Sequence, residues 1–260
     1  MSDQLSHKLK LDRASHHLNS LDAKVRDWRD GETHDYAVEL DRESGKQRVK
    51  VKLSESPPDE FRLIIGDYLH NLRSALDNLI YELAVAYTGF KALPEDRAKR
   101  LEFPIFGPKA MSADACRKRI GCIHPDAQTI IKGLQPYNRG DEFASDPFWK
   151  LYQLSNMDKH RVPHVTLLAI STYADFPEVP GLPGTLTINF GPFEDGAEIA
   201  TYTPLTGDFD PEVHMDPLLT FGIAFGQGSA TPGWNCSLAL RWLHSHIVRD
   251  AVEPLAPYLT

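Results

Sequence analysis

Polar residues that could bind an anion or move a proton are concentrated in two segments of the chain, Gly66–Ala86 and Pro147–Arg161. The first segment carries His70, Arg73, Asp77 and Asn78 close together in sequence. An arginine binds phosphate or carboxylate oxygens through a fixed fork of N–H donors, and a histidine carries a proton near neutral pH. These residue types therefore suit a site that binds a phosphate group and has acid–base chemistry beside it.

The second segment extends a leucine stripe with charged residues. Leu151, Leu154, Asp158 and Arg161 recur at helical spacing, and His160 follows Asp158 closely. Charges on the same stripe as leucines should be at least partly buried, and a buried charge must be paired.

We therefore expect the two segments to meet in space. Asp158 can pair with Arg161 one turn on, or with Arg73 across a helix interface. The sequence predicts that Arg73 or Asp77 lies within hydrogen-bond or ion-pair reach of the second segment, in which the candidate partners are Asp158, His160 and Arg161.

The first segment belongs to an amphipathic helix that we expect over Phe61–Tyr87. At about 100° per residue, seven aliphatic residues fall on one face: Ile65, Leu69, Leu72, Leu76, Leu79, Ile80 and Leu83. The opposite face has short or directional polar groups, and no lysine occurs from Asp59 to Phe90. Solvated helix faces favour long, strongly helix-forming residues such as Lys and Glu. This face is more typical of a covered network of hydrogen bonds.

Two interpretations of such a cluster stay open. Arg, His and Asp between paired helices can form an internal salt-bridge cluster that only fixes helix register. Alternatively, the arginine binds a phosphate or another anion and a histidine transfers a proton.

The remaining pattern predicts an α+β fold. A helix ending near Gly31 precedes alternating residues in Tyr36–Leu40 and Val49–Leu53, which indicate a β-hairpin. Further helices are expected at Ser112–Ile120, His124–Gly133 and Pro147–Arg161, and a closing helix at Asn235–Val252. Period-two segments predict four strands: Val165–Ser171, Thr185–Phe190, Ala197–Tyr202 and Leu218–Phe225.

Helices and strands that come in runs rather than in alternation favour α+β over a doubly wound sheet. We expect a single domain over 1–260. Its helical, bundle-like half would span 1–161, with the N-terminal hairpin. A mainly antiparallel sheet and the closing C-terminal helix would form the half at 162–260.

Charge and composition exclude several classes of protein. The formal net charge is −8, whereas proteins that hold duplex nucleic acid usually have a basic face. Basic residues are concentrated only at Arg97–Arg100 and Arg117–Arg119, runs that are more often solvated surface. Extended duplex DNA is therefore not an expected partner, but a small site for one nucleotide strand is compatible with this charge.

Nothing in the sequence indicates a membrane or a secretory route. The first ten residues have no apolar core, and no apolar run approaches the roughly 20 residues that span a bilayer. The odd number of cysteines, Cys116, Cys122 and Cys236, argues against a disulfide framework. We expect a cytoplasmic protein without a membrane partner.

Familiar cofactor and metal motifs are missing. The chain has no glycine-rich phosphate loop after a strand and no GxSxG elbow. His244 and His246 are two residues apart and would point in different directions on a helix, and Pro163 interrupts helical geometry between His160 and His164. The sequence therefore predicts no metal and no cofactor.

Two short blocks resemble a group of bacterial proteins of unassigned function. These blocks are HNLRSALD at His70–Asp77 and NMDKHR at Asn156–Arg161, accompanied by FPIF at Phe103–Phe106 and LQPY at Leu134–Tyr137. The first block is also similar to the signature of the HEPN superfamily, an arginine followed four to six residues later by a histidine. The resemblance implies an α-helical bundle dimer in which these two residues carry metal-independent RNA cleavage.

Carried onto this chain, the resemblance gives Arg73 the arginine position and Asn78 the place of the histidine. Asparagine is not a general acid or base at neutral pH, so His70 or His160 would have to replace the proton carrier. Asp77 and Asp158 would orient these groups, and Asn78 would donate a hydrogen bond to the ligand.

Two functional hypotheses follow from the sequence. The first is a HEPN-like protein that acts on RNA or a nucleotide, either as a metal-independent ribonuclease or as a degenerate binder. Its catalytic residues would be Arg73, His70 and His160, while Asp77, Asn78, Asp158 and Arg161 would bind or orient the ligand. The second is a non-catalytic protein in which the cluster serves only fold register, partner binding or homodimerisation.

Overall fold

The computed structural model of the chain describes residues 5–31, 34–53, 55–160, 165–169, 184–189, 191, 193–205 and 221–259. The chain forms two compact units, each built from separated stretches of sequence. The first unit comprises Met1–Ser20, Leu63–Pro163 and Leu238–Thr260, and the second comprises Leu21–Arg62 and His164–Ser237.

The first unit is helical. Its larger helices, some of which continue into the second unit, are α1 (Ser6–Arg29), α2 (Asp59–Thr88), α4 (Ala113–Ile120), α5 (Pro125–Gly133), α6 (Pro147–His160) and α7 (Cys236–Ile247). Shorter helical pieces are α3 (Glu95–Ala98), the 3₁₀ segment η1 (Pro136–Ser145), the π-helical segment η2 (Val248–Val252), α8 (Glu253–Leu255) and the 3₁₀ segment η3 (Ala256–Leu259).

Helix α2 supplies the core of this unit. Each of the seven aliphatic residues predicted for its buried face is fully buried, which confirms the periodicity: Ile65, Leu69, Leu72, Leu76, Leu79, Ile80 and Leu83. Burying a Leu or Ile side chain contributes roughly 1.5–3 kcal/mol. The stripe therefore fixes which face of α2 is left for polar contacts.

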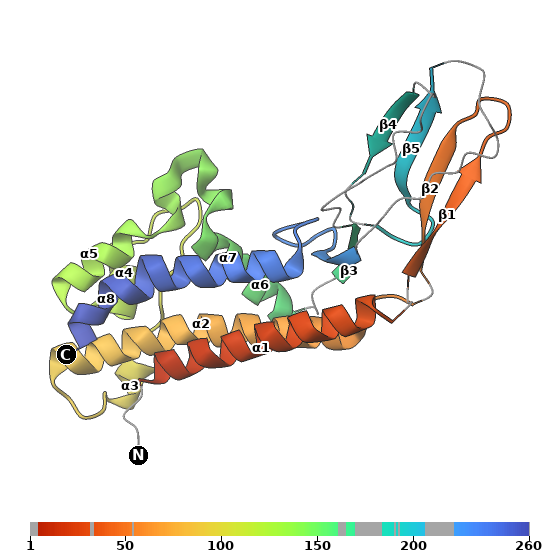
Figure 1. The fold of residues 1–260 in the computed structure, drawn as a ribbon. Helices are drawn as coiled ribbons and strands as arrows, with labels where there is room; N and C mark the ends of the chain where they lie inside the picture. Colours follow the sequence, from red (N-terminus) through yellow and green to blue (C-terminus); the bar gives the residue numbers. More distant parts are fainter. Residues whose placement is uncertain are drawn as a thin grey trace. The chain divides into compact units, whose positions relative to one another are not determined.

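Helices α1 and α7 pack against α2 (Figure 1). The phenolic oxygen of Tyr68 donates a hydrogen bond to the Leu240 carbonyl at 2.7 Å, and Tyr68 is fully buried. Burial raises the pKa of Tyr68, which keeps it a hydrogen-bond donor.

The second unit contains two antiparallel sheets. The hairpin strands β1 (His34–Leu40) and β2 (Gln47–Leu53) join β5 (Glu198–Pro204) and β4 (Gly184–Ile188) in the order β1-β2-β5-β4 (Figure 1). The register between β2 and β5 shifts at Val49/Lys50. Strands β3 (Val165–Ala169) and β6 (Phe221–Phe225) form the other sheet.

The predicted fold class is confirmed: the chain is mixed helix and sheet, with an N-terminal hairpin, antiparallel sheet and a C-terminal helix. The division expected at 161/162 does not match the compact units. Strand β2 pairs with β5, so the hairpin belongs to the unit that holds the later strands, while the chain from Leu238 onward belongs to the helical unit. Strand pairing and helix packing between distant segments decide this division, and local periodicity does not report them.

Two local details also differ from expectation. The short helix α3 lies in a stretch for which the sequence predicted no helix or strand. The closing helix changes to π geometry at Val248. Pro254 lies in the first turn of α8 and has no N–H to donate to the Asp250 carbonyl, which accounts for a change of helical geometry just before it.

Glu82 on α2 binds the first residues of α1 by hydrogen bonds. Its carboxylate accepts hydrogen bonds from the Ser6 hydroxyl at 2.6 Å and from the His7 backbone N–H at 3.1 Å, and it contacts the His7 ring at Nδ1. Burial by itself would raise the pKa of Glu82, but the hydrogen bonds from His7 and Ser6 outweigh it and leave the pKa below its ordinary value of 4.5. The unfolded chain therefore binds a proton at Glu82 more readily, so this contribution to stability is present above pH 4.5 and is lost as the pH falls through the folded-state pKa.

Replacing Glu82 with glutamine should lower the free energy of unfolding at neutral pH by about 1–3 kcal/mol, because charge-assisted hydrogen bonds are weakened. The difference between the original protein and Glu82→Gln should shrink below pH 4.5. Denaturant unfolding measured over a pH series tests both points. Glu60→Gln, which removes an exposed carboxylate of α2 that pairs with Lys24 of α1, should change stability by no more than about 1 kcal/mol.

Candidate functional site

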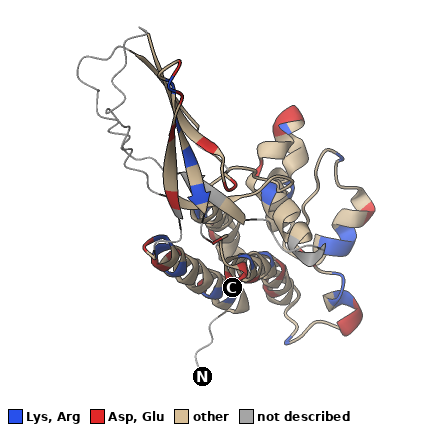
Figure 2. Cartoon of the chain, turned by 90° about the vertical axis from the view of Figure 1, so that its right-hand side faces the viewer, with Lys and Arg blue, Asp and Glu red and all other residues tan. Residues whose placement is uncertain are grey.

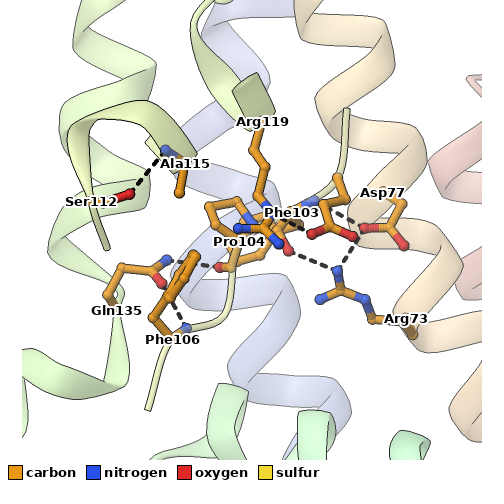
Figure 3. A network of polar contacts seen from close by, with 10 residues as sticks. Arg73, Asp77, Phe103, Pro104, Phe106, Ser112, Ala115, Arg119 and Gln135 are labelled. Atoms are coloured by element: carbon orange, nitrogen blue, oxygen red, sulfur yellow. Dashed lines mark hydrogen bonds and ion pairs between the residues drawn. The ribbon is translucent and has the colours of Figure 1, made fainter. Parts of the chain in front are cut away.

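Arg73 and Asp77 on α2 together hold the backbone of Phe103 (Figure 3). The Nη2 atom of Arg73 donates to the Phe103 carbonyl at 2.7 Å, and the Phe103 N–H donates to Asp77 Oδ1 at 2.9 Å. The same two side chains form an ion pair, with 2.9 Å between Arg73 Nη2 and Asp77 Oδ1. Residues four apart on a helix lie on the same face, so the spacing Arg–x₃–Asp allows both side chains to reach the backbone of the same residue.

Gln135 holds the next part of the same segment. Its side-chain amide donates to the Pro104 carbonyl at 2.8 Å and to the Ile131 carbonyl at 3.0 Å, and its oxygen accepts from the Phe106 N–H at 3.1 Å. Gln135 is only 1% exposed. The extended segment Phe103–Phe106 is thus fixed by α2 on one side and by Gln135, two residues after the end of α5, on the other.

Helix α4 adds a second ion pair. The hydroxyl of Ser112 accepts the Ala115 N–H at 3.1 Å and caps the start of this helix, which was expected at Ser112–Ile120. Near the other end of α4, Arg119 contacts the carboxylate of Glu102, and its guanidinium carbon lies 4.9 Å from the centre of the Phe106 ring. Arg119 is therefore held by a charge and by an aromatic face together.

Helix α6 brings aromatic side chains to the same place. Asp146 caps its N-terminus by accepting the backbone N–H of Phe148 at 2.8 Å and of Trp149 at 3.3 Å. The Phe148 ring stacks on Phe103 with centroids 5.5 Å apart, and the Trp149 ring stacks on Tyr152 with centroids 5.1 Å apart.

Gly107 allows the segment after Phe106 to approach Trp149. A Cβ atom at this position would lie 2.5 Å from Cη2 of the Trp149 indole, which is closer than carbon atoms approach in proteins. Only glycine lets the chain pass this ring without displacing it.

These elements enclose a pocket of about 420 Å³, within the usual size range of small-molecule sites. The residues that line it come from α2, α4, α6 and the 102–109 segment: Arg73, Asp77, Glu102, Phe103, Ile105, Phe106, Gly107, Pro108, Lys109, Arg119, Trp149, Tyr152, Ser155 and Asn156.

The pocket has excess positive charge and unsatisfied donors. Arg73 is paired with Asp77 and Arg119 with Glu102, while Lys109 makes no ion pair with a described residue. The Nη1 atom of Arg73 and the hydroxyl of Ser155 are buried and have no hydrogen-bond partner within the described part of the chain. The Arg73 side chain is 16% exposed and Ser155 6%. Buried polar groups in native proteins are nearly always paired, so two unpaired donors at one pocket indicate a place for a ligand atom.

The structure brings Arg73 and Asp77 into this pocket but not His70 or Asn78. His70 is exposed, and its Nε2 lies 3.5 Å from the Ser74 hydroxyl. Asn78 is half-buried on α2 and does not line the pocket. Five residues on a helix correspond to about 500°, so Asn78 points well away from the direction of Arg73.

The structure does not describe the other three predicted site residues in full. The side chains of Asp158 and His160 and the whole of Arg161 lie outside the described residues. The expected pairing of Arg73 or Asp77 with Asp158, His160 or Arg161 therefore stays a prediction.

Several pocket residues were not recognised from the sequence. Trp149, Tyr152 and Ser155 lie in the segment Pro147–Arg161, but no motif singles them out. Gln135 holds the segment that lines the pocket, and in the sequence it is only part of the block LQPY. A residue such as Ser155 is identified by its burial without a partner, which depends on the tertiary structure.

Within the described ranges, no group of three His, Cys, Asp or Glu side chains is placed to hold a metal ion. The three cysteines are free thiols. None of the described helices is both long enough and apolar enough to cross a bilayer.

No protein-family model, no curated protein and no solved structure matches the chain significantly. The geometry and chemistry of the pocket therefore carry the functional argument.

Replacing Gln135 with leucine tests what positions the Phe103–Phe106 segment. The change leaves the Pro104 carbonyl and the Phe106 N–H without their partner, so the free energy of unfolding should fall by about 2–4 kcal/mol. Chemical denaturation measures the loss. Asn138→Ala is a suitable control, because Asn138 bonds the Lys132 and Gly133 carbonyls at the surface; an equal loss in that variant would contradict a special role for Gln135.

Proposed function

We propose that the protein binds RNA or a nucleotide through the pocket at Arg73, with a phosphate group at Arg73 and Ser155 and a base against the aromatic side chains of α6. The observation that carries the proposal is the pair of buried donors at one pocket, Arg73 Nη1 and Ser155 Oγ, neither of which has a hydrogen-bond partner in the described ranges.

Arg73 is suited to a phosphate because its orientation is fixed before a ligand arrives. One of its terminal nitrogens binds the Phe103 carbonyl and Asp77, and the other, Nη1, has no hydrogen-bond partner among the residues that the structure describes. A guanidinium held in one orientation loses little conformational entropy when it binds an oxyanion. Lys109 adds a second positive charge at the same pocket.

The aromatic side chains provide the surface that a base requires. Trp149 and Tyr152 stack with an angle of 18° between their planes and both line the pocket. Bases stack on aromatic side chains with a contribution of about 1–3 kcal/mol each, with little dependence on sequence. Asn156 lines the same pocket and offers both a donor and an acceptor for a base edge.

Binding rather than cleavage is the activity that the described residues support. No histidine with a described side chain lines the pocket, so His70 is not placed to act on a group bound at Arg73. In a HEPN-like ribonuclease the proton carrier would then have to be His160. RNA cleavage that disappears in His160→Ala would favour that catalytic version over simple binding.

A structural role is the second candidate, and one observation favours it. Arg73 and Asp77 form an ion pair with each other, and together they bind the backbone N–H and C=O of Phe103. If this contact were the whole role of Arg73, its substitution would change stability and no ligand would bind.

Replacing Arg73 with lysine separates the two candidates, since lysine keeps the charge but loses the planar fork. We expect affinity for adenosine 5′-monophosphate or a short 5′-phosphorylated RNA to fall by roughly 10–100-fold, which corresponds to the loss of a charge-assisted hydrogen bond. Isothermal titration calorimetry at fixed salt measures the change.

Arg249→Lys is the matched control, because Arg249 is an exposed arginine paired with Asp250 and does not line the pocket. The affinity of the Arg249→Lys variant for these ligands should equal that of the original protein. If the original protein binds neither adenosine 5′-monophosphate nor the short RNA, the proposed function is wrong.

Ser155→Ala should affect binding and stability differently. Removal of a buried hydroxyl that has no partner should leave the free energy of unfolding unchanged or raise it by about 1 kcal/mol. Binding of the same ligands should weaken about fivefold, the value of one ordinary hydrogen bond. Denaturant unfolding and calorimetry on the same preparation test the pair of outcomes.

Ser74→Ala serves as the control for this change, because Ser74 lies next to Arg73 on α2 but does not line the pocket. A loss of stability in Ser155→Ala without a loss of affinity would show that the hydroxyl serves the fold and not a ligand.

A further inference from the structure

The structure brings the two basic runs of the sequence together around a second pocket. Arg97 and Arg100, in and just after α3, line it with Arg117 and Lys118 of α4 and with Cys122. The volume of this pocket is about 300 Å³. Acidic residues occur on these two helices as well (Figure 2), because Glu95 and Asp96 lie in the first turn of α3 and Asp114 lies in the first turn of α4.

The charge at this pocket is only partly offset. Asp114 pairs with Arg117 at 2.6 Å and with Lys118 at 2.7 Å, so one carboxylate serves two cations. Arg97 and Arg100 make no ion pair with any described residue, and no carboxylate lines the pocket. Cations held this close repel one another, and a bound anion relieves that repulsion.

Consecutive residues of the chain line the two pockets. Leu101 and Lys118 line the basic pocket, whereas Glu102 and Arg119 line the pocket at Arg73. Neighbouring Cα atoms are about 3.8 Å apart, so the walls of the two pockets adjoin at two places.

We propose that the basic pocket binds the backbone phosphates of a single-stranded RNA whose neighbouring nucleotide occupies the pocket at Arg73. This inference rests on the proposed function and extends it from a nucleotide to a strand of several nucleotides. Regularly spaced phosphates match two adjoining cationic sites, and flexible single strands can follow a groove in which a duplex would not fit. The aromatic residues of the first pocket favour RNA over an acidic peptide, because they provide a stacking surface for a base.

The test compares ligands of different length on the double variant Arg97→Ala/Arg100→Ala. An octanucleotide RNA should bind the original protein more tightly than adenosine 5′-monophosphate and with a steeper salt dependence. Loss of two phosphate contacts should reduce the slope of log K against log salt by about 1.4 for a single strand. Affinity for the mononucleotide should not change, because neither arginine lines the pocket at Arg73.

Lys91→Ala/Lys99→Ala is the matched control. It removes the same number of charges from the same stretch of chain, and neither lysine lines the basic pocket. Its salt slope for the octanucleotide should equal that of the original protein. Equal slopes in all three proteins would overturn the inference.

A second measurement uses Cys122 and needs no change of charge. In a Cys116→Ser background, bound octanucleotide should slow alkylation of Cys122 several-fold, while the mononucleotide should not. Cys236 is fully buried and serves as an internal reference. Unchanged alkylation of Cys122 at saturating octanucleotide would overturn the placement of the strand.

The outcomes distinguish the inference from the function on which it depends. Mononucleotide binding that depends on Arg73, with no gain for the octanucleotide, leaves the proposed function intact and overturns the extension. Failure of both ligands to bind overturns the proposed function, and the extension falls with it. A polyglutamate peptide that displaces the octanucleotide and protects Cys122 equally well would overturn RNA as the occupant.

Discussion

The site depends on one residue, Phe103, whose backbone N–H and C=O are both bound by side chains of α2. Asp77 accepts the N–H and Arg73 donates to the carbonyl, while the two side chains pair with each other. The ring of the same residue is fully buried and stacks on Phe148 of α6. Phe103 thereby links α2 to α6, through its backbone on one side and its ring on the other. Together with the bonds from Gln135 to Pro104 and Phe106, this link fixes the path of the segment that lines the pocket.

The same interaction explains how Arg73 can serve both the fold and a ligand. A guanidinium has five N–H donors, and the Phe103 carbonyl and Asp77 are both bound through Nη2. The fold therefore orients the side chain, and Nη1 has no partner within the described part of the chain. A buried donor without a partner costs stability, and the same holds for Ser155 at the same pocket. Our proposal that a ligand binds here follows from these two costs, because a ligand would supply the missing acceptors.

The helical unit contains two local concentrations of positive charge that the net charge of the chain does not indicate. The formal net charge of the chain is −8, yet the two adjoining pockets are both rich in cations. At the first, the positive charges are partly neutralised by Asp77 and Glu102, and at the second by Asp114. A protein of this kind should repel extended duplexes over most of its surface and accept an anionic strand only where cations converge.

The sequence by itself determined the longer helices, most strand positions, the buried face of α2 and the presence of Arg73 and Asp77 on its polar face. Local periodicity, capping residues and proline positions report these features because they depend on neighbours within a few residues. Tertiary structure decided the rest. It paired the hairpin with β5, kept His70 on the surface, and brought Ser155 beside Arg73 in one pocket. It also joined two basic runs, each of which looked like ordinary surface, around one pocket. Such proximity depends on how distant segments pack, and a pattern of residue types along one chain does not encode it locally.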